Sequence, residues 1–507
     1  MDFPILTIII FFPLVAGFLC LATGKRQLLC RSIALVITVI ELALVIFLSS
    51  INFHPFAGPT GTWVLVEDYS WIPTLGIRYS LGLDGISYLL LLLTAFINVL
   101  CVLISWRAIV HRVGSFHFFL LFLETSVLGL FLATDLFLFY LFWEVQLLPM
   151  FFLVGIWGHE GRVHAAIKFA LFTLCGGLLM LVAIIGLYLL HGAQTGVYTF
   201  AYAELMKTNL SPYTQFWLYA AFLLAFAIKV PVIPLHTWLP DTHTHAPTAG
   251  SLDLAGLLLK TGFYALFRFA FPLFPDAARA SIPILIALGL VGLFYASWLA
   301  LSQIDVKRLV AYSSIGHMGI MVVGLAVWNM MTLSGSILQM INHGLSTTAL
   351  FVMVGMIDER LHSRKFENLG GLWHKMPVFS GFFLFFAMAS LGLPGLNNFV
   401  GEILIIIGTF QARPVIGILS FAGLVFGVIY ILRMVQDTIF GQPVKEHVHI
   451  LNDIDFREGV TLALLALPIL FIGLHPGPVL RLLDHPVQHL LTQFSSVGVG
   501  ALLPPGF

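Results

Sequence analysis

Long apolar stretches follow one another along almost the whole chain, and they constrain the fold more than any other feature. A helix that spans a bilayer needs about 20 predominantly apolar residues, and about fourteen stretches reach that length. They cover residues 3–22, 30–50, 82–106, 115–133, 136–156, 165–190, 213–233, 249–271, 281–301, 308–327, 331–357, 378–411, 415–437 and 459–475. Only 9% of the residues are charged, whereas a soluble domain carries about 25%. The sequence therefore predicts an all-α polytopic membrane protein with about 14 transmembrane helices.

Ionisable side chains lie deep inside several of these stretches. Placing one charge at the bilayer centre costs about 2.5–3.5 kcal/mol on insertion scales, and such residues commonly move ions or protons. The residues with long apolar flanks on both sides are Glu144, Lys168, Lys229, Lys260, His317, His343 and Glu402. We predict that these residues form a path for protons or ions.

Simpler roles are open for most of these residues. Glu144 could bond a neighbouring hydroxyl, and the two histidines could be satisfied core residues. Lys168 and Lys229 could extend along the membrane to an interface. Glu402 follows a predicted helix break, where it could serve as a cap. Lys260 lies eleven residues into its stretch and has no such explanation.

Five further acidic residues are weaker candidates for this path. Glu124 lies within its stretch and could belong to the same network. The other four lie at predicted span ends, and we expect them to be caps or loop charges: Asp135, Asp241, Asp253 and Asp305.

Prolines interrupt two of the stretches beside a charge. Pro231 and Pro234 follow Lys229, and Pro394 precedes Glu402. Proline removes a backbone donor and clashes with the preceding turn. Helices broken at membrane depth line polar paths in transporters, although a simple proline kink would give the same pattern.

The spacing of the charges predicts an internal repeat. The intervals are 24 and 61 residues from Glu144 through Lys168 to Lys229, and 26 and 59 residues in the second half. Each half holds five stretches, of which the fourth is broken. Because five is odd, the two halves enter the membrane from opposite sides, which predicts two inverted five-helix repeats. The expected domains are a three-helix segment with a hairpin (1–110), two repeat bundles (111–275 and 276–440), and a C-terminal helix and tail (441–507).

Lysine and arginine set the expected orientation. The odd-numbered connections carry fifteen of these residues, and the even-numbered connections with the tail carry six. Loops rich in lysine and arginine face the cytoplasm, so both termini are expected on the outer side. Residues 52–80 would form the longest outward loop, and β-prone runs such as 63–66 predict a small hairpin there.

The cysteines give no sign of a redox or metal centre. Cys20, Cys30, Cys101 and Cys175 lie in or beside apolar stretches without metal-ligand or redox spacing. The sequence also has no glycine-rich nucleotide fingerprint after a strand. We predict no cofactor, no metal and no redox chemistry in this chain itself.

Several long motifs resemble the antiporter-like membrane subunits of complex I, the proton-pumping NADH:quinone oxidoreductase. They lie at 135–144, 149–158, 226–241, 246–260, 305–319 and 393–402. The resemblance covers nearly the whole chain. Sister subunits usually carry lysine where this chain has Glu402, so the acid favours one particular branch of the family.

The resemblance implies proton translocation in a bacterial inner membrane, driven by quinone reduction elsewhere in the complex. In such a membrane the lysine and arginine bias places both termini in the periplasm. Glu144 would pair with Lys229, Lys260 would lead on to the histidines, and Glu402 would end the path. The implied partners are neighbouring antiporter-like subunits and lipid, with quinone and NADH reached only through the complex and no nucleic acid. The alternatives are a multi-subunit Na⁺(cation)/H⁺ antiporter, a related membrane-bound hydrogenase-type complex, or a structural scaffold.

Overall fold

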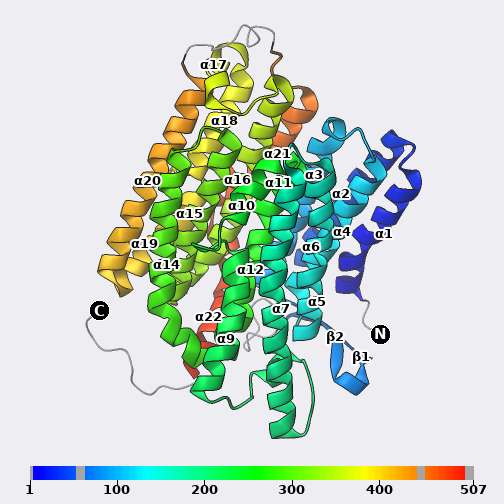
Figure 1. The fold of residues 1–507 in the computed structure, drawn as a ribbon, viewed down its shortest axis with the longest axis vertical. Coiled ribbons are helices and arrows are strands. Elements are labelled where there is room, and N and C mark those ends of the chain that lie inside the picture. The colour runs from blue at the N-terminus through cyan, green and yellow to red at the C-terminus, as the bar shows by residue number, and fades with distance from the viewer. Residues whose placement is uncertain (1–3, 53–62, 442–450, 497–507) are drawn as a thin grey trace.

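The computed structural model describes residues 4–52, 63–441 and 451–496, and most of them are helical (Figure 1). Within these residues, twelve helical segments are long and apolar enough to cross a membrane. The predicted stretches at 213–233 and 378–411 are not among the twelve. The helix in the first stretch ends at Lys229, and the second stretch is divided into the helices Pro377–Ser390 and Asn397–Ala412. The predicted all-α membrane fold is confirmed.

The N-terminal part combines three helices with a small sheet. Its elements are α1 (Ile5–Thr23), α2 (Gln27–Asn52), β1 (Leu65–Ile72), the 3-10 turn η2 (Pro73–Leu75), β2 (Ile77–Leu83) and α3 (Gly85–Ala108). The two strands pair antiparallel, with Leu65 opposite Leu83. The predicted hairpin is therefore present, although residues 53–62 of its loop lie outside the described residues.

The first half of the remaining chain contains a broken helix and two π-helical turns. Its elements are α4 (Val113–Leu132), α5 (Leu136–Val145), α6 (Leu147–Trp157), α7 (Arg162–Thr195), α8 (Tyr202–Leu205), α9 (Pro212–Lys229), α10 (Trp238–His245), α11 (Thr248–Asp253), η3 (Leu254–Leu258), α12 (Leu259–Ala265), η4 (Leu266–Ala270) and α13 (Phe271–Leu273). The break lies between α9 and α10, at the prolines that the sequence singled out.

The second half contains the other broken helix. Its elements are α14 (Pro275–Leu301), α15 (Val306–Val327), α16 (Met330–Leu361), η5 (Phe366–Asn368), α17 (Leu372–Lys375), α18 (Pro377–Ser390), α19 (Asn397–Ala412) and α20 (Pro414–Ile439). In this half α16 packs against α19, as α7 packs against α9 in the first half. This parallel favours the predicted inverted repeats at 111–275 and 276–440, which stay predictions.

Two helices follow: α21 (Phe456–Leu474) and α22 (Gly477–Ser496). The sequence predicted only a tail after residue 475, and α22 corrects that expectation. One face of α22 buries Leu483, Val487 and Leu490, and the helix packs against α3 and α16. This helix has 20 residues, but its four charged or histidine positions interrupt the long apolar run by which spans were recognised.

Aspartates start several helices by accepting hydrogen bonds from first-turn amides. Asp135 accepts from two amides of α5, and Asp305 accepts from one amide of α15, so the predicted capping roles of both are confirmed. Asp455 caps α21. Partial burial opposes its ionisation, but the Glu458 amide and nearby arginines outweigh this effect and hold the pKa of the Asp455 carboxyl below its usual value.

Two basic residues that the sequence assigned to connections are buried instead. Lys307 donates to the Ala246 carbonyl at 2.6 Å, and Arg268 pairs with Asp84 at the start of α3. Lys307 was counted with the odd-numbered connections and Arg268 with the even-numbered ones. Leaving both out lowers each total by one, so lysine and arginine still favour the same end of the molecule.

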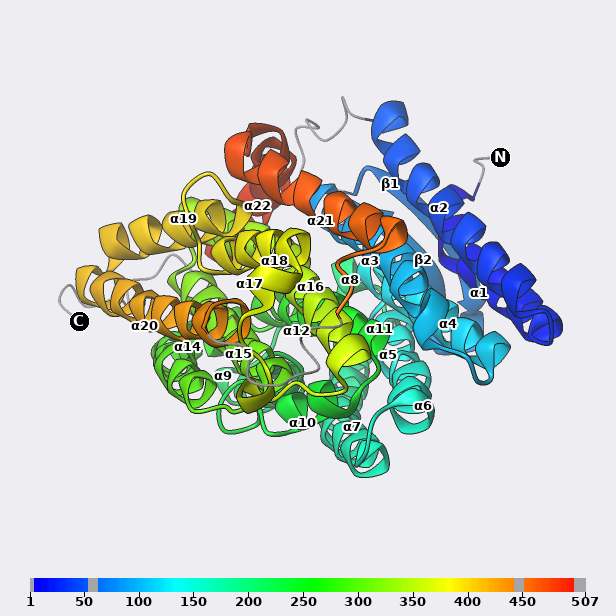
Figure 2. The same cartoon turned by 90° about the horizontal axis from the view of Figure 1, so that it is seen from above.

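The most buried helices lie at the centre of the molecule. The most apolar 18-residue window is fully buried in the span at 248–273 and in α16, whereas only 28% of it is buried in α2 and in α20. Figure 2 shows α11, α12 and α16 in the interior, with α2 at one edge and α20 at the opposite edge. Polar residues on α12 and α16 are therefore shielded on all sides.

Candidate functional site

Four of the predicted residues form a continuous chain in the interior. The Lys260 ammonium lies 2.8 Å from Nδ1 of His343. The rings of His343 and His317 have centroids 5.3 Å apart, and Nδ1 of His317 lies 3.3 Å from Oε1 of Glu402. All four side chains are buried. Amine, imidazole and carboxyl groups can each take up or release a proton. The two imidazole rings are in contact, but among the described residues no hydrogen bond joins them, so a proton moving along this row would have to cross from one ring to the other.

Lys260 is held by an unusual stretch of helix. It lies on α12 between the π-helical turns η3 and η4, and single π turns inside α-helices are frequent at functional sites. Its ammonium donates to the carbonyl of Ala255 in η3 and contacts His343. Its exposed fraction is 0%. The charge is thus positioned by the backbone of its own helix and by an imidazole on α16.

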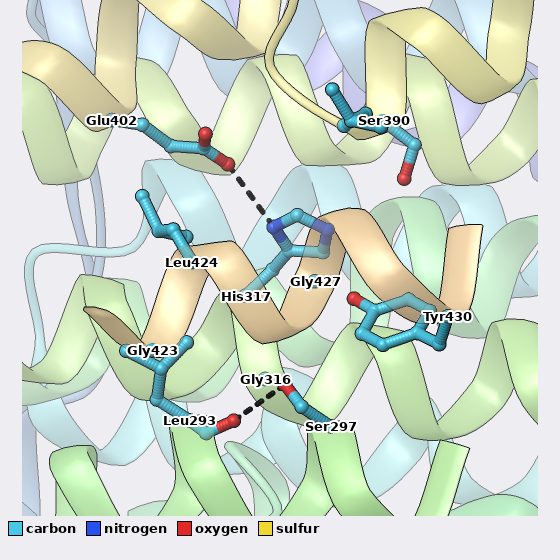
Figure 3. Close-up of a pocket in the computed structure, with 11 residues that line it drawn as sticks. Leu293, Ser297, Gly316, His317, Ser390, Glu402, Gly423, Leu424, Gly427 and Tyr430 are labelled. Carbon is cyan, nitrogen blue, oxygen red and sulfur yellow. Dashed lines mark hydrogen bonds and ion pairs between the residues drawn. The ribbon is translucent and has the colours of Figure 1, made fainter. Parts of the chain in front are cut away.

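Glu402 ends the chain beside the second broken helix (Figure 3). It lies five residues beyond Asn397, the first residue of α19, so the capping alternative is wrong. Its carboxylate accepts a hydrogen bond from Gln339 at 3.2 Å. Gly392, with φ of +78°, lies so close to Glu402 that a Cβ there would collide with the carboxylate. Glycine at the break therefore lets the acid approach the non-helical backbone.

A small enclosed cavity adjoins this end of the chain. It has a volume of about 10 Å³, which is room for about one water molecule. His317 and Glu402 line it together with Ser297, Ser390 and Tyr430 (Figure 3). A water in this cavity would have hydroxyl, imidazole and carboxyl partners, so the cavity can extend the proton path beyond His317.

The other predicted pair, Glu144 and Lys229, is not joined by contacts as close as those between Lys260 and His343. Lys229 is the last residue of α9 before the first break, and its exposed fraction is 1%. Its ammonium lies 4.4 Å from the ring centroid of Trp143. Glu144 contacts Gly177 of α7 and interacts electrostatically with Lys229. Among the described residues the two charges form no direct ion pair, and the snorkelling alternative for Lys229 is wrong because the ammonium is enclosed by protein.

Lys168 stands apart from both groups. Its ammonium lies 2.6 Å from Oδ2 of Asp241, which also pairs with Arg308 at 3.4 Å. The side chain of Lys168 is 24% exposed. The structure therefore satisfies Lys168 with a carboxylate on α10 and does not bring it into contact with Lys229 or Lys260.

Sequence reasoning missed several neighbours of these residues. Gln339 lies four residues before His343 on the same face of α16, and this spacing could have revealed it. Trp143 precedes Glu144 directly, but nothing in the sequence shows that its ring faces Lys229. His243 is fully buried and stacks on Phe351, with centroids 4.6 Å apart; its run of alternating histidines was the available signal.

Comparisons with known proteins decide the family. The family model described as "NADH:quinone oxidoreductase/Mrp antiporter, TM" matches residues 133–430. NADH-quinone oxidoreductase subunit M of Pseudomonas aeruginosa is 46% identical, covering 94% of this chain and 95% of that protein. The Escherichia coli K12 subunit M is 43% identical, covering 93% and 94%. The chain belongs to the subunit M family. The resemblance inferred from the motifs is confirmed, and so is the branch that Glu402 favoured.

Solved structures of two kinds of complex contain chains with the same fold. A chain of respiratory complex I from Thermus thermophilus with bound NADH has a TM-score of 0.85 at 29% identity, covering 96% of this chain and 99% of that chain. A chain of the Mrp complex from Dietzia sp. DQ12-45-1b has a TM-score of 0.84 at 20% identity. The second likeness shows that the fold is shared with an Mrp complex.

Proposed function

We propose that this chain is an antiporter-like, proton-translocating membrane subunit of a complex I. The observation that carries the proposal is the buried chain from Lys260 through His343 and His317 to Glu402, in a member of the subunit M family. A buried ammonium, two imidazoles and a carboxyl within contact of one another have no evident structural purpose, since they are costly to place inside a membrane protein. They are the groups that proton relays use.

The first bundle supplies the coupling element in this proposal. Glu144 of α5 and Lys229 of α9 interact electrostatically without a direct ion pair. A nearby carboxylate favours the charged form of a lysine, and burial disfavours it. Small movements at the broken helix would therefore change whether Lys229 holds its proton, and Lys260 would receive or supply that proton.

The chain acts within a larger assembly. Its partners are the other membrane subunits of complex I, and quinone reduction by NADH takes place elsewhere in that complex. The contribution of this chain is proton movement and not electron transfer. Purified alone, it should show no stoichiometric visible absorbance from haem, flavin or iron–sulfur, and such a band would contradict this part of the proposal.

The protein is a multi-pass protein of the bacterial inner membrane, and we propose that both termini face the periplasm. The bias of lysine and arginine toward one end of the molecule supports this orientation. A cytoplasm-only fluorescent reporter fused after Phe507 should stay dark. A bright fusion would overturn either the orientation or the number of spans.

The deciding experiment replaces Lys260 in the intact complex. Lys260→Met keeps the length of the side chain and removes the proton site, so proton uptake by inverted membrane vesicles should fall by about tenfold or more, a barrier increase of at least roughly 1.4 kcal/mol. Lys207→Met, at an exposed lysine paired with Glu204, is the matched control and should pump normally. Assembly is checked on native gels. Normal pumping by assembled Lys260→Met would overturn the proposal.

An antiporter subunit that exchanges cations for protons is the remaining candidate for this fold. Greater similarity to subunit M than to the Mrp chain argues against it. Adding and removing sodium during the proton-uptake assay discriminates the two, because only an antiporter requires the cation.

A further inference from the structure

A large open cavity lies off the chain of proton-binding residues. Its volume is about 440 Å³, and it is bounded by the ends of α3, α6, α11 and α16. Four titratable side chains line it: His159, Asp358, Glu359 and His362. It opens at the end of the molecule that carries most of the lysine and arginine, which is the cytoplasmic end in the proposed orientation.

The inner part of the cavity approaches a buried carboxyl group. Ser105 of α3 and Ala249 of α11 line the cavity, and each has a neighbour one turn deeper on its own helix. These neighbours are Cys101 and Asp253, which contact each other: the Cys101 thiol lies 3.4 Å from Oδ1 of Asp253 and 3.6 Å from the Ala249 carbonyl. Asp253 therefore lies directly behind the cavity wall.

Asp253 was expected to be a cap or loop charge, and that expectation is wrong. Its exposed fraction is 0%, and it lies within the buried span at 248–273. Oδ2 has no hydrogen-bond partner among the described residues. A buried carboxyl oxygen without a partner is costly, so a carboxyl group held in this way has its second oxygen available for a proton or a water.

Asp253 and Lys260 belong to one continuous helical segment. Seven residues separate them, which is about 10 Å along a helix. The segment between them is the π-helical turn η3, and Lys260 reaches back into it to the Ala255 carbonyl. Thr348 of α16 packs against Gly256 in the same turn, and its hydroxyl has no hydrogen-bond partner among the described residues. Polar atoms therefore continue from Asp253 toward the Lys260–His343 contact.

We propose that this cavity and Asp253 form a proton-uptake branch that supplies Lys260 from the cytoplasmic end. The Asp253 carboxylate takes a proton from water in the cavity and becomes neutral. It then releases that proton toward the neutral Lys260 amine, which becomes an ammonium, and the carboxylate is restored. Cys101 positions the carboxyl through its thiol. This inference rests on the proposed function, because it assigns a source to the proton that Lys260 carries.

The first test replaces Asp253 in the intact complex. Asp253→Asn keeps the shape and cannot take up a proton, so proton uptake at neutral pH should fall by about tenfold, as loss of a proton-transfer group commonly does. Asp253→Glu should largely restore it. The matched control is Glu41→Gln, because Glu41 is also fully buried and its carboxyl oxygens have no hydrogen-bond partner among the described residues. Glu41 lies on α2, is not among the residues that line the cavity, and interacts with Glu124 of α4, which in turn interacts with Asp253.

The second test blocks the cavity. Thr248→Cys places a thiol on its wall, in a background where the exposed Cys175 is replaced by serine. A charged, membrane-impermeant methanethiosulfonate reagent added on the cytoplasmic side should modify this thiol and stop proton uptake. Ser302→Cys, at an exposed position of the same end, should be modified without effect.

The outcomes separate this inference from the proposed function. If Lys260→Met is inactive while Asp253→Asn pumps normally, or while the modified Thr248→Cys protein pumps normally, the uptake branch is refuted and the proposed function stands. If the Thr248→Cys thiol resists modification, the cavity is closed to water and the branch is also refuted. If assembled Lys260→Met pumps normally, the proposed function itself fails.

Discussion

The two halves of this molecule hold their charged residues in different ways. Lys260 of α12, at the end of the first half, and His343, His317 and Glu402 of the second half follow one another at contact distances. In the first half, Lys229 lies over the Trp143 ring, and its predicted partner Glu144 interacts with it only across a gap. The acid beside the second broken helix, Glu402, therefore ends a connected relay, whereas the lysine beside the first broken helix, Lys229, belongs to a separated pair.

This difference indicates that the connected relay and the separated pair have different roles in proton movement. A connected relay passes a proton whenever one end is loaded, so it offers little control by itself. A separated pair changes strongly when the distance between its charges changes, since an interaction between charges in a protein interior varies steeply with distance and solvation. Control of proton movement is therefore expected at Glu144 and Lys229, and conduction at the relay.

The largest effect is expected from interrupting the relay at its middle. His343→Leu removes the group that contacts both Lys260 and His317, so proton uptake should fall by about tenfold or more. Vesicle proton uptake and quinone-reductase activity are measured with assembly checked separately. His117→Leu, at a fully buried histidine on α4, controls for the loss of any buried imidazole. Pumping by His343→Leu at the control level would show that the relay is not the path.

The next largest effect is expected from the separated pair. Glu144→Gln keeps the shape and removes the charge that tunes Lys229, so assembly should be normal and pumping strongly reduced. Glu144→Asp should be milder because it keeps the charge. Lys229→Ala should resemble Glu144→Gln, and the double variant should lose much less than the sum of the two, because both changes remove one interaction. Full additivity in proton-uptake rates would mean that the two residues act independently.

A smaller effect is expected from replacing Trp143, whose ring faces the Lys229 ammonium. A cation over an aromatic face is stabilised by about 0.5–2 kcal/mol, which is about two-fold to thirty-fold in an equilibrium constant. Trp143→Leu leaves the charge of Glu144 in place, so we expect the pumping rate to change by a few-fold, at the lower end of this range. Trp143→Phe should lie between this variant and the parent, since phenylalanine keeps an aromatic face. The comparison uses initial rates of proton uptake. An effect as large as that of Glu144→Gln would make Trp143 a principal partner of Lys229.

The sequence predicted much of this arrangement, for a clear physical reason. Apolar stretches of membrane length and charges inside them are visible as patterns along the chain, so the helices and the seven candidate residues could be named. The prolines beside Lys229 and Glu402 marked both broken helices correctly. Helix-starting aspartates such as Asp135 were also predictable, because capping depends on neighbouring residues alone.

Contacts between distant segments could not be predicted in this way. Nothing along the chain shows that the Lys260 ammonium meets His343 and not an acid, or that Asp253 lies behind a cavity formed by four helices. The amphipathic helix α22 was missed because its apolar face is short and interrupted by charges. Spacing shows which residues share a face, and three-dimensional packing decides which faces meet.

The smallest effect is expected at Lys168, and it tests the comparison most directly. Lys168 was predicted as part of the path, but it pairs with Asp241 at a partly exposed position. Ion pairs near a surface are worth about 0.2–1 kcal/mol, so Lys168→Met and Asp241→Asn should each lower thermal stability slightly and leave proton uptake unchanged. The double variant should be no less stable than Asp241→Asn, since that change alone already removes the ion pairs of Asp241 with Lys168 and with Arg308.

Thermal unfolding of the assembled complex and vesicle proton uptake measure the two properties separately. Lys207→Met again serves as the control for removing an exposed lysine. If Lys168→Met reduces proton uptake as much as Glu144→Gln does, Lys168 exchanges protons with the first bundle. The first half would then hold a longer relay with a connection through α7, and the contrast between a separated pair and a connected relay would no longer hold.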